Sequence, residues 1–306
     1  MIKQVINIEE ARKLWNEEVG FIYPLSKELF FQNVTSYRNA FIYGYYEDEE
    51  LLGFIVFKKP FDNFIKDYNK KAWISLIYVK ENSRKKGIGA MLIVKALEEL
   101  KNFDEVRVGG DLFNFFPGVP DDFLVLMTKL LTKFNFSVTG ECYDMINLNL
   151  QKHPYRGETY LTRYLTKEDL PKLKEFITAA FPGRWEFEVC DYIKKGGTGK
   201  EFLCTFIDDK IVGYIRVNKQ DNVDIPYNTN WKTIFGDDLV GLGPLGVSKE
   251  YRKLGIGYNL LVKTFNTLVE EGYRKALIDW TGLVPFYQKF GFQTFKRFVY
   301  FVYKRK

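Results

Sequence analysis

A twelve-residue segment occurs twice along the chain, and this repeat constrains the fold more than any other feature. Residues 84–95 read RKKGIGAMLIVK and residues 252–263 read RKLGIGYNLLVK, with eight of the twelve positions identical. Each half of the 306-residue chain therefore holds one copy, which indicates a duplicated domain. We predict two domains, residues 1–150 and 151–306, which join at the polar segment 151–157.

Both halves share one order of strands and helices. Runs rich in β-branched and aromatic residues predict strands, and helical apolar periodicity follows each repeat. In the first half we expect strands at residues 40–46, 51–57, 73–79 and 106–110 and a helix at residues 87–100. In the second half we expect strands at residues 202–207, 211–217, 239–247 and 275–280 and a helix at residues 255–271. This order predicts an α/β fold in each half, with helices packed on the faces of a mixed sheet.

Composition excludes several classes of function. The spacing of Cys142, Cys190 and Cys204 fits neither a disulfide framework nor a zinc site, so we expect a reducing, cytoplasmic location and no metal. His153 is the only histidine, which leaves a serine or cysteine triad without its usual base. The net charge of +6 is scattered, and no apolar run reaches the roughly 18 residues of a membrane span. We therefore expect neither nucleic acid nor a membrane as a partner.

In both copies a strand leads into a turn with cationic residues and two glycines, and the turn opens a helix. The first amides of a helix lack intrahelical partners and glycines let the backbone approach a phosphate, so this turn predicts an anion site. Neither copy has the GK[ST] ending of a P-loop, and Leu92 and Leu260 replace the last glycine of GxGxxG. The candidate residues in the second copy are Arg252, Lys253, Leu254, Gly255, Ile256, Gly257 and Tyr258. Those in the first copy are Arg84, Lys85, Lys86, Gly87 and Gly89.

The pattern R-x-x-G-x-G after a strand resembles motif A of the GNAT superfamily, whose members are acetyl-CoA-dependent N-acetyltransferases. The later segment FYQKFGF, residues 286–292, resembles the FYxKxGF signature that closes the acyl-CoA site of this family. The resemblance implies two tandem GNAT folds, with acetyl-CoA as the cosubstrate of the second and a candidate second CoA site at residues 84–89. It also implies that the strand 242–247 splays from residues 275–280 and bonds the pantetheine arm. The residues that it adds to the cofactor site are Leu245, Gly246, Val247 and Lys289.

Tyr287 stands where the GNAT signature often places a general acid. Attack of an amine on a thioester expels a thiolate, and a phenol with a pKa of about 10 can protonate that sulfur at neutral pH. The first copy reads LLTKFNF, which places Leu131 at the position of the tyrosine and Asn135 at that of Gly291. Leucine cannot donate a proton, so we expect a non-catalytic first domain and a catalytic second one.

Asp279 is the leading candidate for the general base, because it ends a predicted strand beside the splay. The same carboxylate could instead orient the substrate amine, or it could cap the turn before Gly282. Asp237 and Asp238 are reserve candidates for the base.

The segment FPGRW, residues 181–185, falls where GNAT proteins place their acceptor-binding helices. Arg184 and Trp185 are our candidates for reading a polar substrate through charge and ring stacking, although a helix start alone also explains the segment. Together with the ending WTGLVPFYQKFGF, it resembles bacterial glucosamine and glucosaminide N-acetyltransferases. We predict acetyl transfer to a primary amine of a small molecule, with an amino sugar as first choice. Aminoglycosides, polyamines, amino acids and protein N-termini or lysines are alternatives, as is a non-catalytic CoA-binding sensor.

The first copy carries twelve more residues between its two motifs than the second. They include an aromatic loop bounded by proline and glycine, Phe113–Pro120. We expect this loop to pack at a domain interface, with a wall of the substrate cleft as the alternative.

Overall fold

The computed structural model of the chain describes residues 1–36, 39–60, 65–219 and 221–305. Its elements form two compact units, Met1–Tyr143 with Lys296–Lys306 (unit 1) and Asp144–Phe295 (unit 2). These units differ from the predicted division at two places. Residues 144–150 belong to unit 2, and residues 296–306 belong to unit 1.

Unit 1 is built on a mixed sheet. Its strands are β1 (Ile2–Gln4), β2 (Ala40–Glu47), β3 (Glu50–Lys58), β4 (Lys71–Val79), β5 (Glu105–Val108), β6 (Val119–Pro120), the first part of β7 (Ser137–Asn147) and most of β13 (Gln293–Lys304). Its helices are α1 (Ile8–Val19), α2 (Lys27–Phe31), α3 (Ile88–Glu99) and α4 (Leu124–Leu131). The strand order is β1-β2-β3-β4-β5-β13-β7, with β6 beside β13. Antiparallel β3–β4 and parallel β4–β5 pairs confirm the predicted mixed sheet.

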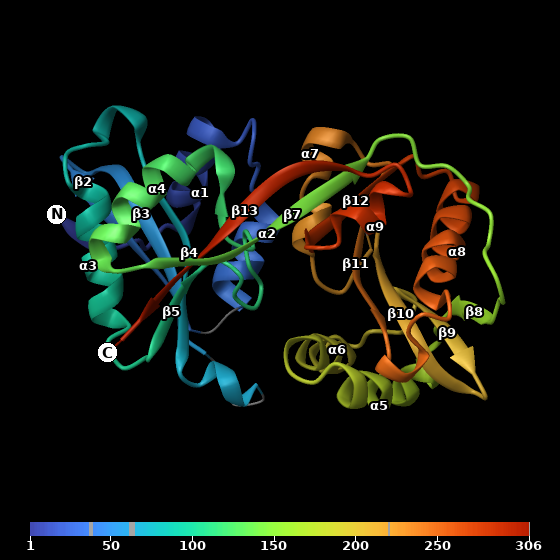
Figure 1. The fold of residues 1–306 in the computed structure, drawn as a ribbon. Coiled ribbons are helices and arrows are strands. Elements are labelled where there is room, and N and C mark those ends of the chain that lie inside the picture. The colour runs from blue at the N-terminus through green and yellow to red at the C-terminus, as the bar shows by residue number, and fades with distance from the viewer. Residues whose placement is uncertain (37–38, 61–64, 220, 306) are drawn as a thin grey trace. The chain divides into compact units, whose positions relative to one another are not determined.

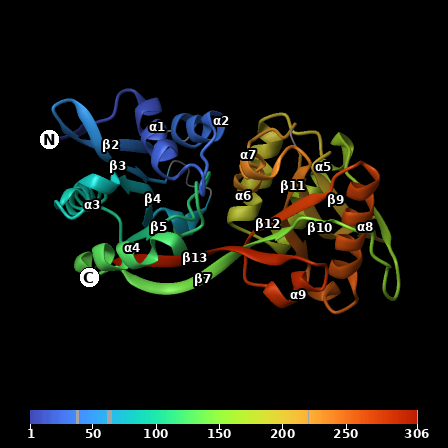
Figure 2. The ribbon, with the colours of Figure 1, turned by 90° about the horizontal axis from the view of Figure 1, so that it is seen from above.

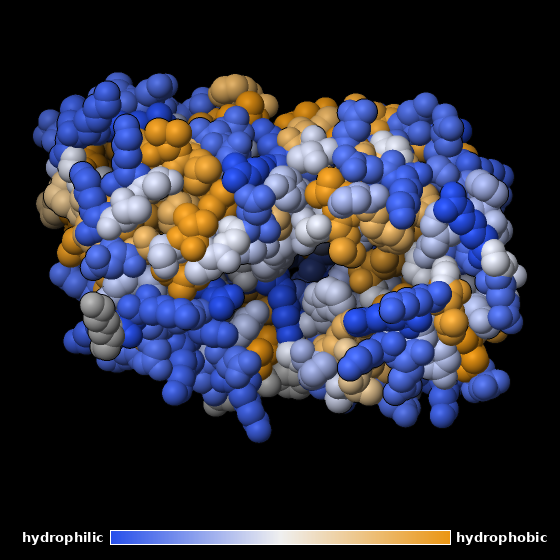
Figure 3. Space-filling model, in the orientation of Figure 1, coloured by the Kyte–Doolittle hydropathy of each residue, from blue (hydrophilic) through white to orange (hydrophobic). Residues whose placement is uncertain are grey.

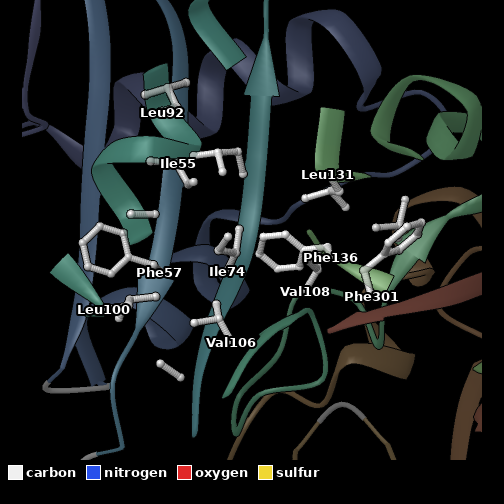
Figure 4. Close-up of a cluster of buried hydrophobic side chains, with 14 of the residues drawn as sticks. Ile55, Phe57, Ile74, Leu92, Leu100, Val106, Val108, Leu131, Phe136 and Phe301 are labelled. Atoms are coloured by element: carbon white, nitrogen blue, oxygen red, sulfur yellow. The ribbon is translucent and has the colours of Figure 1, made fainter. Parts of the chain in front are cut away.

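Helices cover both faces of this sheet. Every residue of β3 from Leu51 to Lys58 is buried, as a strand covered on both sides requires. Helices α1 and α3 both contact β3, and Figure 2 shows them on opposite sides of the sheet. The core cluster drawn in Figure 4 includes Ile55, Ile74, Leu92, Leu131, Phe136 and Phe301.

The C-terminal strand completes this core. β13 pairs antiparallel with β5, from Phe301 opposite Val108 to Lys304 opposite Glu105, and it lies next to β7 (Figure 1). Phe301 is 1% exposed. The end of the chain therefore belongs to unit 1 because its apolar side chains are buried there, which explains the difference from the predicted domain 151–306.

Unit 2 repeats the architecture of unit 1. Its strands are the last part of β7, β8 (Leu161–Tyr164), β9 (Phe202–Ile207), β10 (Lys210–Asn218), β11 (Leu239–Val247) and β12 (Lys275–Thr281), in the order β7-β12-β11-β10-β9-β8. Its helices are α5 (Leu170–Ala180), α6 (Arg184–Lys194), α7 (Lys232–Phe235), α8 (Ile256–Glu270) and α9 (Val284–Gln288). β11 and β12 are parallel, whereas β9, β10 and β11 pair antiparallel in succession. Helices α5 and α8 both pack against β10.

The predicted linker 151–157 is packed polypeptide within unit 2. The side-chain amide of Asn266 accepts from the backbone N–H of His153 at 2.8 Å and donates to its carbonyl at 3.1 Å. The side-chain amide of Asn259 likewise accepts from the backbone N–H of Arg156 at 2.9 Å and donates to its carbonyl at 2.8 Å. Two asparagines on α8 therefore fix this segment along the helix.

The aromatic loop Phe113–Pro120 contributes to the core of unit 1. Phe116 is buried, and its ring centroid is 5.6 Å from that of Trp15. Nearby, the buried ammonium of Lys58 bonds Asp111 Oδ1 at 2.6 Å. The loop thus contributes to the core of the unit that contains it, and its place at a domain interface stays a prediction.

Candidate active site

The repeated turn has the same backbone in both units. Lys253 and Gly255 have positive φ angles of 70° and 77°, and Lys85 and Gly87 have φ angles of 64° and 85°. The second of each pair directly precedes a helix, α8 or α3. Glycine adopts this left-handed conformation without a steric penalty, which explains its place in both copies. The predicted strand–turn–helix unit is confirmed twice.

The turn of unit 2 presents a row of unbonded amides. Within the described ranges, the backbone N–H groups from Lys253 to Tyr258 have no protein acceptor. Arg252 and Lys253 are exposed beside them, and Arg252 Nε donates to the carbonyl of Val247 at 3.1 Å, at the end of β11. Free amides at a helix N-terminus with two adjacent cations can hold a diphosphate.

β11 and β12 separate before this turn. Their parallel pairing ends with Leu242 opposite Ile278, whereas β11 continues to Val247 along β10. In unit 1 the pairing of β4 with β5 ends at the corresponding residue, Ile74, opposite Val108. The far edge of β11 is therefore not paired with β12 beyond Leu242, as the family resemblance implied.

Gly246 lies on this part of β11, where we expected a contact with the cofactor. A Cβ atom here would lie 2.6 Å from the ring of Phe181 and 2.8 Å from that of Tyr214. Aromatic packing thus fills the side-chain position, so the glycine is required by the core. Only its backbone is left to face a pantetheine arm.

Asp279 is the first residue of β12 beyond the paired region. Its Oδ1 lies beside Gly243 of β11, 3.6 Å from the place of a Cβ, and accepts a hydrogen bond from Asn228 Nδ2 at 3.0 Å. Burial raises the pKa of Asp279 to about 6, although the bond from Asn228 and the charge of Arg184 lower it. A carboxylate with this pKa is ionised at neutral pH and can still take up a proton.

Two of the alternatives for the acidic residues, a turn cap at Asp279 and a base at Asp237 or Asp238, find no support in the structure. Thr281, not Asp279, closes the turn after β12, because its Oγ1 accepts from the backbone N–H two residues on at 3.0 Å. Asp237 and Asp238 precede β11, and Asp238 bonds Lys275 at 2.9 Å at the other end of the strand pair. Of the predicted carboxylates, the structure brings Asp279 to the open end.

Tyr287 is buried in α9, with 5% of its surface exposed. Its ring packs edge to face against Phe286, with centroids 5.2 Å apart. Burial raises the pKa of Tyr287 above its ordinary value, and the nearby charge of Asp279 raises it further. The phenol therefore stays protonated at neutral pH and lies within electrostatic reach of Asp279.

Leu131 holds the corresponding position in unit 1. The N–H of Phe292 donates to the carbonyl of Tyr287 at 3.4 Å, and the N–H of Phe136 donates to the carbonyl of Leu131 at 3.2 Å. The Leu131 side chain is fully buried in the core (Figure 4). The alignment of the two segments is thus confirmed, and unit 1 has no phenol at this position.

The structure brings only one of the two predicted acceptor residues to Asp279. The guanidinium of Arg184 lies 4.4 Å from the ring centroid of Trp280, and its Nε donates to Glu188 at 2.7 Å. Arg184 lowers the pKa of Asp279 and Glu188 raises it, so both side chains act on this carboxylate. Trp185 instead packs against the core cluster of α5 and α6.

Three residues of the site were not predicted: Asn228, Glu188 and Trp280. Glu188 follows Arg184 by one helical turn, a spacing at which an ion pair can form. Asn228 lies in a short helical turn between β10 and β11, in a segment rich in asparagine. That local enrichment was the one available signal for it.

The remaining predicted cofactor residues flank the turn. Tyr258 packs on Phe290 at 4.9 Å, and the guanidinium of Arg156 lies 4.5 Å from the Tyr258 ring centroid. Lys289 is exposed directly after α9, whereas Ile256 is buried and offers only its backbone. Arg156, from the supposed linker, thus adds a cation near the turn.

Unit 1 contains a cavity of about 640 Å³ beside its own copy of the turn. Ser75 lines it, and the buried hydroxyl of Ser75 has no hydrogen-bond partner. Arg84 is tied to β4, because its Nε donates to the carbonyl of Val79 at 3.1 Å and its Nη2 to the hydroxyl of Tyr78 at 2.8 Å. Helix α4 forms one wall, and apolar residues gather over this helix in Figure 3. Four residues of the candidate second CoA site line the cavity: Arg84, Lys85, Gly87 and Gly89.

Other features bear on the chemistry that the chain can support. In the part of the chain that the structure describes, no cluster of three or more His, Cys, Asp or Glu side chains could hold a metal. The same residues include no helix of the length and apolarity needed to cross a bilayer. The three cysteines form no disulfide.

Sequence comparison identifies a family. The model of the acetyltransferase (GNAT) family matches residues 6–109 and 170–292, which together make up more than half of the chain. Both copies of the turn fall within the matched regions. No curated protein matches the chain.

Solved structures share the fold across both units. A glucosamine N-acetyltransferase region of a fungal multi-domain GH3 β-N-acetylglucosaminidase is 19% identical with a TM-score of 0.87, and the match covers 99% of this chain but 38% of that one. A tandem GNAT protein from the clavulanic acid biosynthesis pathway is 13% identical with a TM-score of 0.67, over 99% and 98% of the two chains. A GCN5-related N-acetyltransferase from Sphaerobacter thermophilus is 14% identical with a TM-score of 0.68, over 99% and 95%. At these identities the similarity shows the fold, here two tandem GNAT folds.

Proposed function

This chain belongs to the acetyltransferase (GNAT) family, and on this premise we propose that unit 2 transfers an acetyl group from acetyl-CoA to a primary amine of a small molecule. The observation that carries the proposal is a pair of titratable groups: Asp279, beside Gly243 at the open end of β11 and β12, and Tyr287, which lies within reach of its charge. The raised pKa of Asp279 allows its carboxylate to accept a proton near neutral pH, and the raised pKa of Tyr287 keeps its phenol protonated. Amide formation from an ammonium and a thioester needs such a base and such an acid.

We propose that the turn of unit 2 binds the diphosphate of CoA. Its free amides from Lys253 to Tyr258 and the exposed Arg252 fit an anion, and Arg156 adds positive charge beside Tyr258. The pantetheine arm would lie along the unpaired edge of residues 245–247. When bound, acetyl-CoA supplies the activated acetyl thioester.

The two titratable groups divide the proton transfers between them. Asp279 takes a proton from the ammonium of the acceptor, directly or through one water, and so frees the nitrogen lone pair for attack. As the new C–N bond forms and the C–S bond breaks, Tyr287 gives its phenolic proton to the departing sulfur, and the second proton that the nitrogen loses restores the phenol. The charge on Asp279 favours the protonated phenol beforehand.

The pH profile of kcat/KM should show the protonation state of Asp279. We expect kcat/KM to fall as the pH drops below about 6, because the raised pKa of Asp279 leaves the carboxyl protonated there and unable to act as a base. Initial rates of thiol release between pH 5 and 9 would measure this. Asp279→Asn should lower the plateau and remove this acid limb, and an identical limb in Asp279→Asn would contradict the assignment.

We propose an amino sugar as the acceptor. The carboxylates of Asp279 and Glu188 suit an ammonium, and Arg184 over Trp280 offers a charged, planar surface for hydroxyl groups. The solved structure with a TM-score of 0.87 is named for glucosamine N-acetylation, which supports the same choice. A panel of glucosamine, an aminoglycoside, a polyamine, amino acids and a lysine peptide would test it. Faster turnover of any other class would replace glucosamine in this proposal.

We propose that unit 1 binds CoA without turning it over. Its turn repeats that of unit 2, a cavity of about 640 Å³ lies beside it, and Leu131 replaces the phenol. The free hydroxyl of Ser75 offers that cavity a hydrogen bond for a ligand. We also propose a cytoplasmic location, since the three cysteines form no disulfide and a CoA thioester is a metabolite of that compartment.

A further inference from the structure

A chain of three asparagine side chains ends on Asp279. The backbone N–H of Lys219 donates to Asn222 Oδ1 at 3.1 Å, and Asn222 Nδ2 donates to Asn218 Oδ1 at 2.9 Å. Asn218 Nδ2 donates to Asn228 Oδ1 at 3.2 Å, and Asn228 Nδ2 donates to Asp279 Oδ1 at 3.0 Å. All five residues belong to unit 2.

The two ends of this chain fix its direction. A backbone N–H can only donate and an ionised carboxylate can only accept, so each amide must turn its oxygen toward Lys219 and its NH₂ toward Asp279. Asn218 and Asn228 are each 1% exposed, so water does not compete for these bonds. Rotation of the Asn228 amide by half a turn would set two NH₂ groups against each other at Asn218 and two oxygens against each other at Asp279.

The strand beside Asn228 makes room for it. A Cβ on Gly241 would lie 2.0 Å from Asn228 Oδ1, so a larger residue at this position of β11 would exclude the side chain. Gly241 also pairs directly with Asn218 across the sheet. Glycine weakens a strand interior, and its presence here is explained by the asparagine that it admits.

The described residues of unit 1 differ at the positions that correspond to Asn218, Gly241 and Asp279. The pair that corresponds to Asn218 and Gly241 is Lys58 opposite Trp73. Gly109 follows Val108, the last residue of β5 that pairs with β4. At the same place in unit 2, Asp279 follows Ile278, the last residue of β12 that pairs with β11. The unit without a phenol at the position of Tyr287 thus also has no carboxylate at the position of Asp279.

We propose that Asn228 is a positioning residue, whose amide is oriented by Asn218 and Asn222 so that it keeps Asp279 ionised and directed at the ammonium of the acceptor. This inference rests on the proposed function. The backbone N–H of Asp279 also favours its ionisation. Of the charged groups that act on it, Glu188 opposes the ionisation and Arg184 favours it, while the phenol of Tyr287 lies nearby. Without the N–H of Asn228, one of the groups that lower the pKa of Asp279 is lost, so burial and Glu188 raise this pKa further.

The test is the pH profile of kcat/KM for acetyl-CoA and the best amine, measured on the full chain. In Asn228→Ala the acid limb should move up by about one pH unit, since a hydrogen bond to a charged group is lost, and the plateau should fall. Asn33→Ala is the matched control, because Asn33 in unit 1 is also 1% exposed and donates its Nδ2 to the carbonyl of Asn114 at 3.0 Å. Its acid limb should coincide with that of the parent protein. A limb unchanged in Asn228→Ala overturns the inference.

A second variant covers the case in which Asn228→Ala does not fold. Asn222→Ala removes a partly exposed side chain at the far end of the chain of asparagines, and its acid limb should move in the same direction by a smaller amount. An unchanged limb in this variant contradicts the orienting role. If the parent protein acetylates no amine in the panel, the proposed function itself fails. If the parent is active and both variants keep its limb, only the inference fails.

Discussion

Replacement of Tyr287 by phenylalanine is expected to lower kcat for acetyl transfer by about 10²- to 10⁴-fold, the usual contribution of a general acid. The ring is buried and packs against Phe286, so phenylalanine keeps these contacts and loses only the hydroxyl. The departing sulfur then has no phenolic proton to accept. Release of free CoA thiol at saturating acetyl-CoA and amine measures the effect.

Tyr164→Phe is the matched control for this change. Tyr164 is on β8 of unit 2, and its hydroxyl is also buried but has no hydrogen-bond partner. This variant should turn over at the parent rate. If Tyr287→Phe retains the parent kcat while Asp279→Asn loses activity, the sulfur is protonated by another group and our role for Tyr287 is wrong.

The second large effect concerns stability. Lys58→Met is expected to lower the free energy of unfolding of unit 1 by about 3–5 kcal/mol, the range for breaking a buried ion pair. Neither Lys58 nor Asp111 has any exposed side-chain surface, and the ammonium also donates to the carbonyl of Phe113 at 2.8 Å. The variant leaves a buried carboxylate without its partner. Urea denaturation followed by tryptophan fluorescence would measure the loss.

Two further variants separate charge from packing at this position. Lys70→Met removes a lysine whose contact with Asp104, at 3.7 Å, is exposed, and it should change stability by less than about 0.5 kcal/mol. The double variant Lys58→Met/Asp111→Leu should recover part of the stability lost in Lys58→Met, because no unpaired charge stays buried. A loss of equal size in the single and double variants would contradict the electrostatic explanation.

The local parts of the fold could be predicted from the sequence, and the long-range pairings could not. The repeat, the glycine turns and the helices that became α3 and α8 follow from residues close together in the chain. The place of β13 depends on its pairing with β5, almost 200 residues earlier, and its apolar pattern suits a strand in either unit. The core role of Phe116 likewise depends on Trp15, which no local pattern connects to it.

The candidate site shows the same limit. Tyr287 and Asp279 were predicted because motif position and strand order place them. Asn228 was not, because its role depends on Asn218, Gly241 and Asp279 meeting from three different elements. Trp185 and Gly246 were expected at the ligand, yet both are explained by aromatic packing. Composition shows that an aromatic ring is present, and only the tertiary structure shows which way it faces.

The claim that unit 2 carries the chemistry, with its turn around the diphosphate, is tested most directly by one paired measurement. Gly257 and Gly89 occupy the same place in the two turns, and a Cβ meets only side-chain methyl groups there, at 3.5 Å from Val247 and 3.3 Å from Leu130. We predict that Gly257→Val lowers kcat/KM for acetyl-CoA by about tenfold or more, as expected when contacts to a charged group are lost, and that Gly89→Val keeps the parent value. Loss of transfer in Gly89→Val with full activity in Gly257→Val would contradict the account.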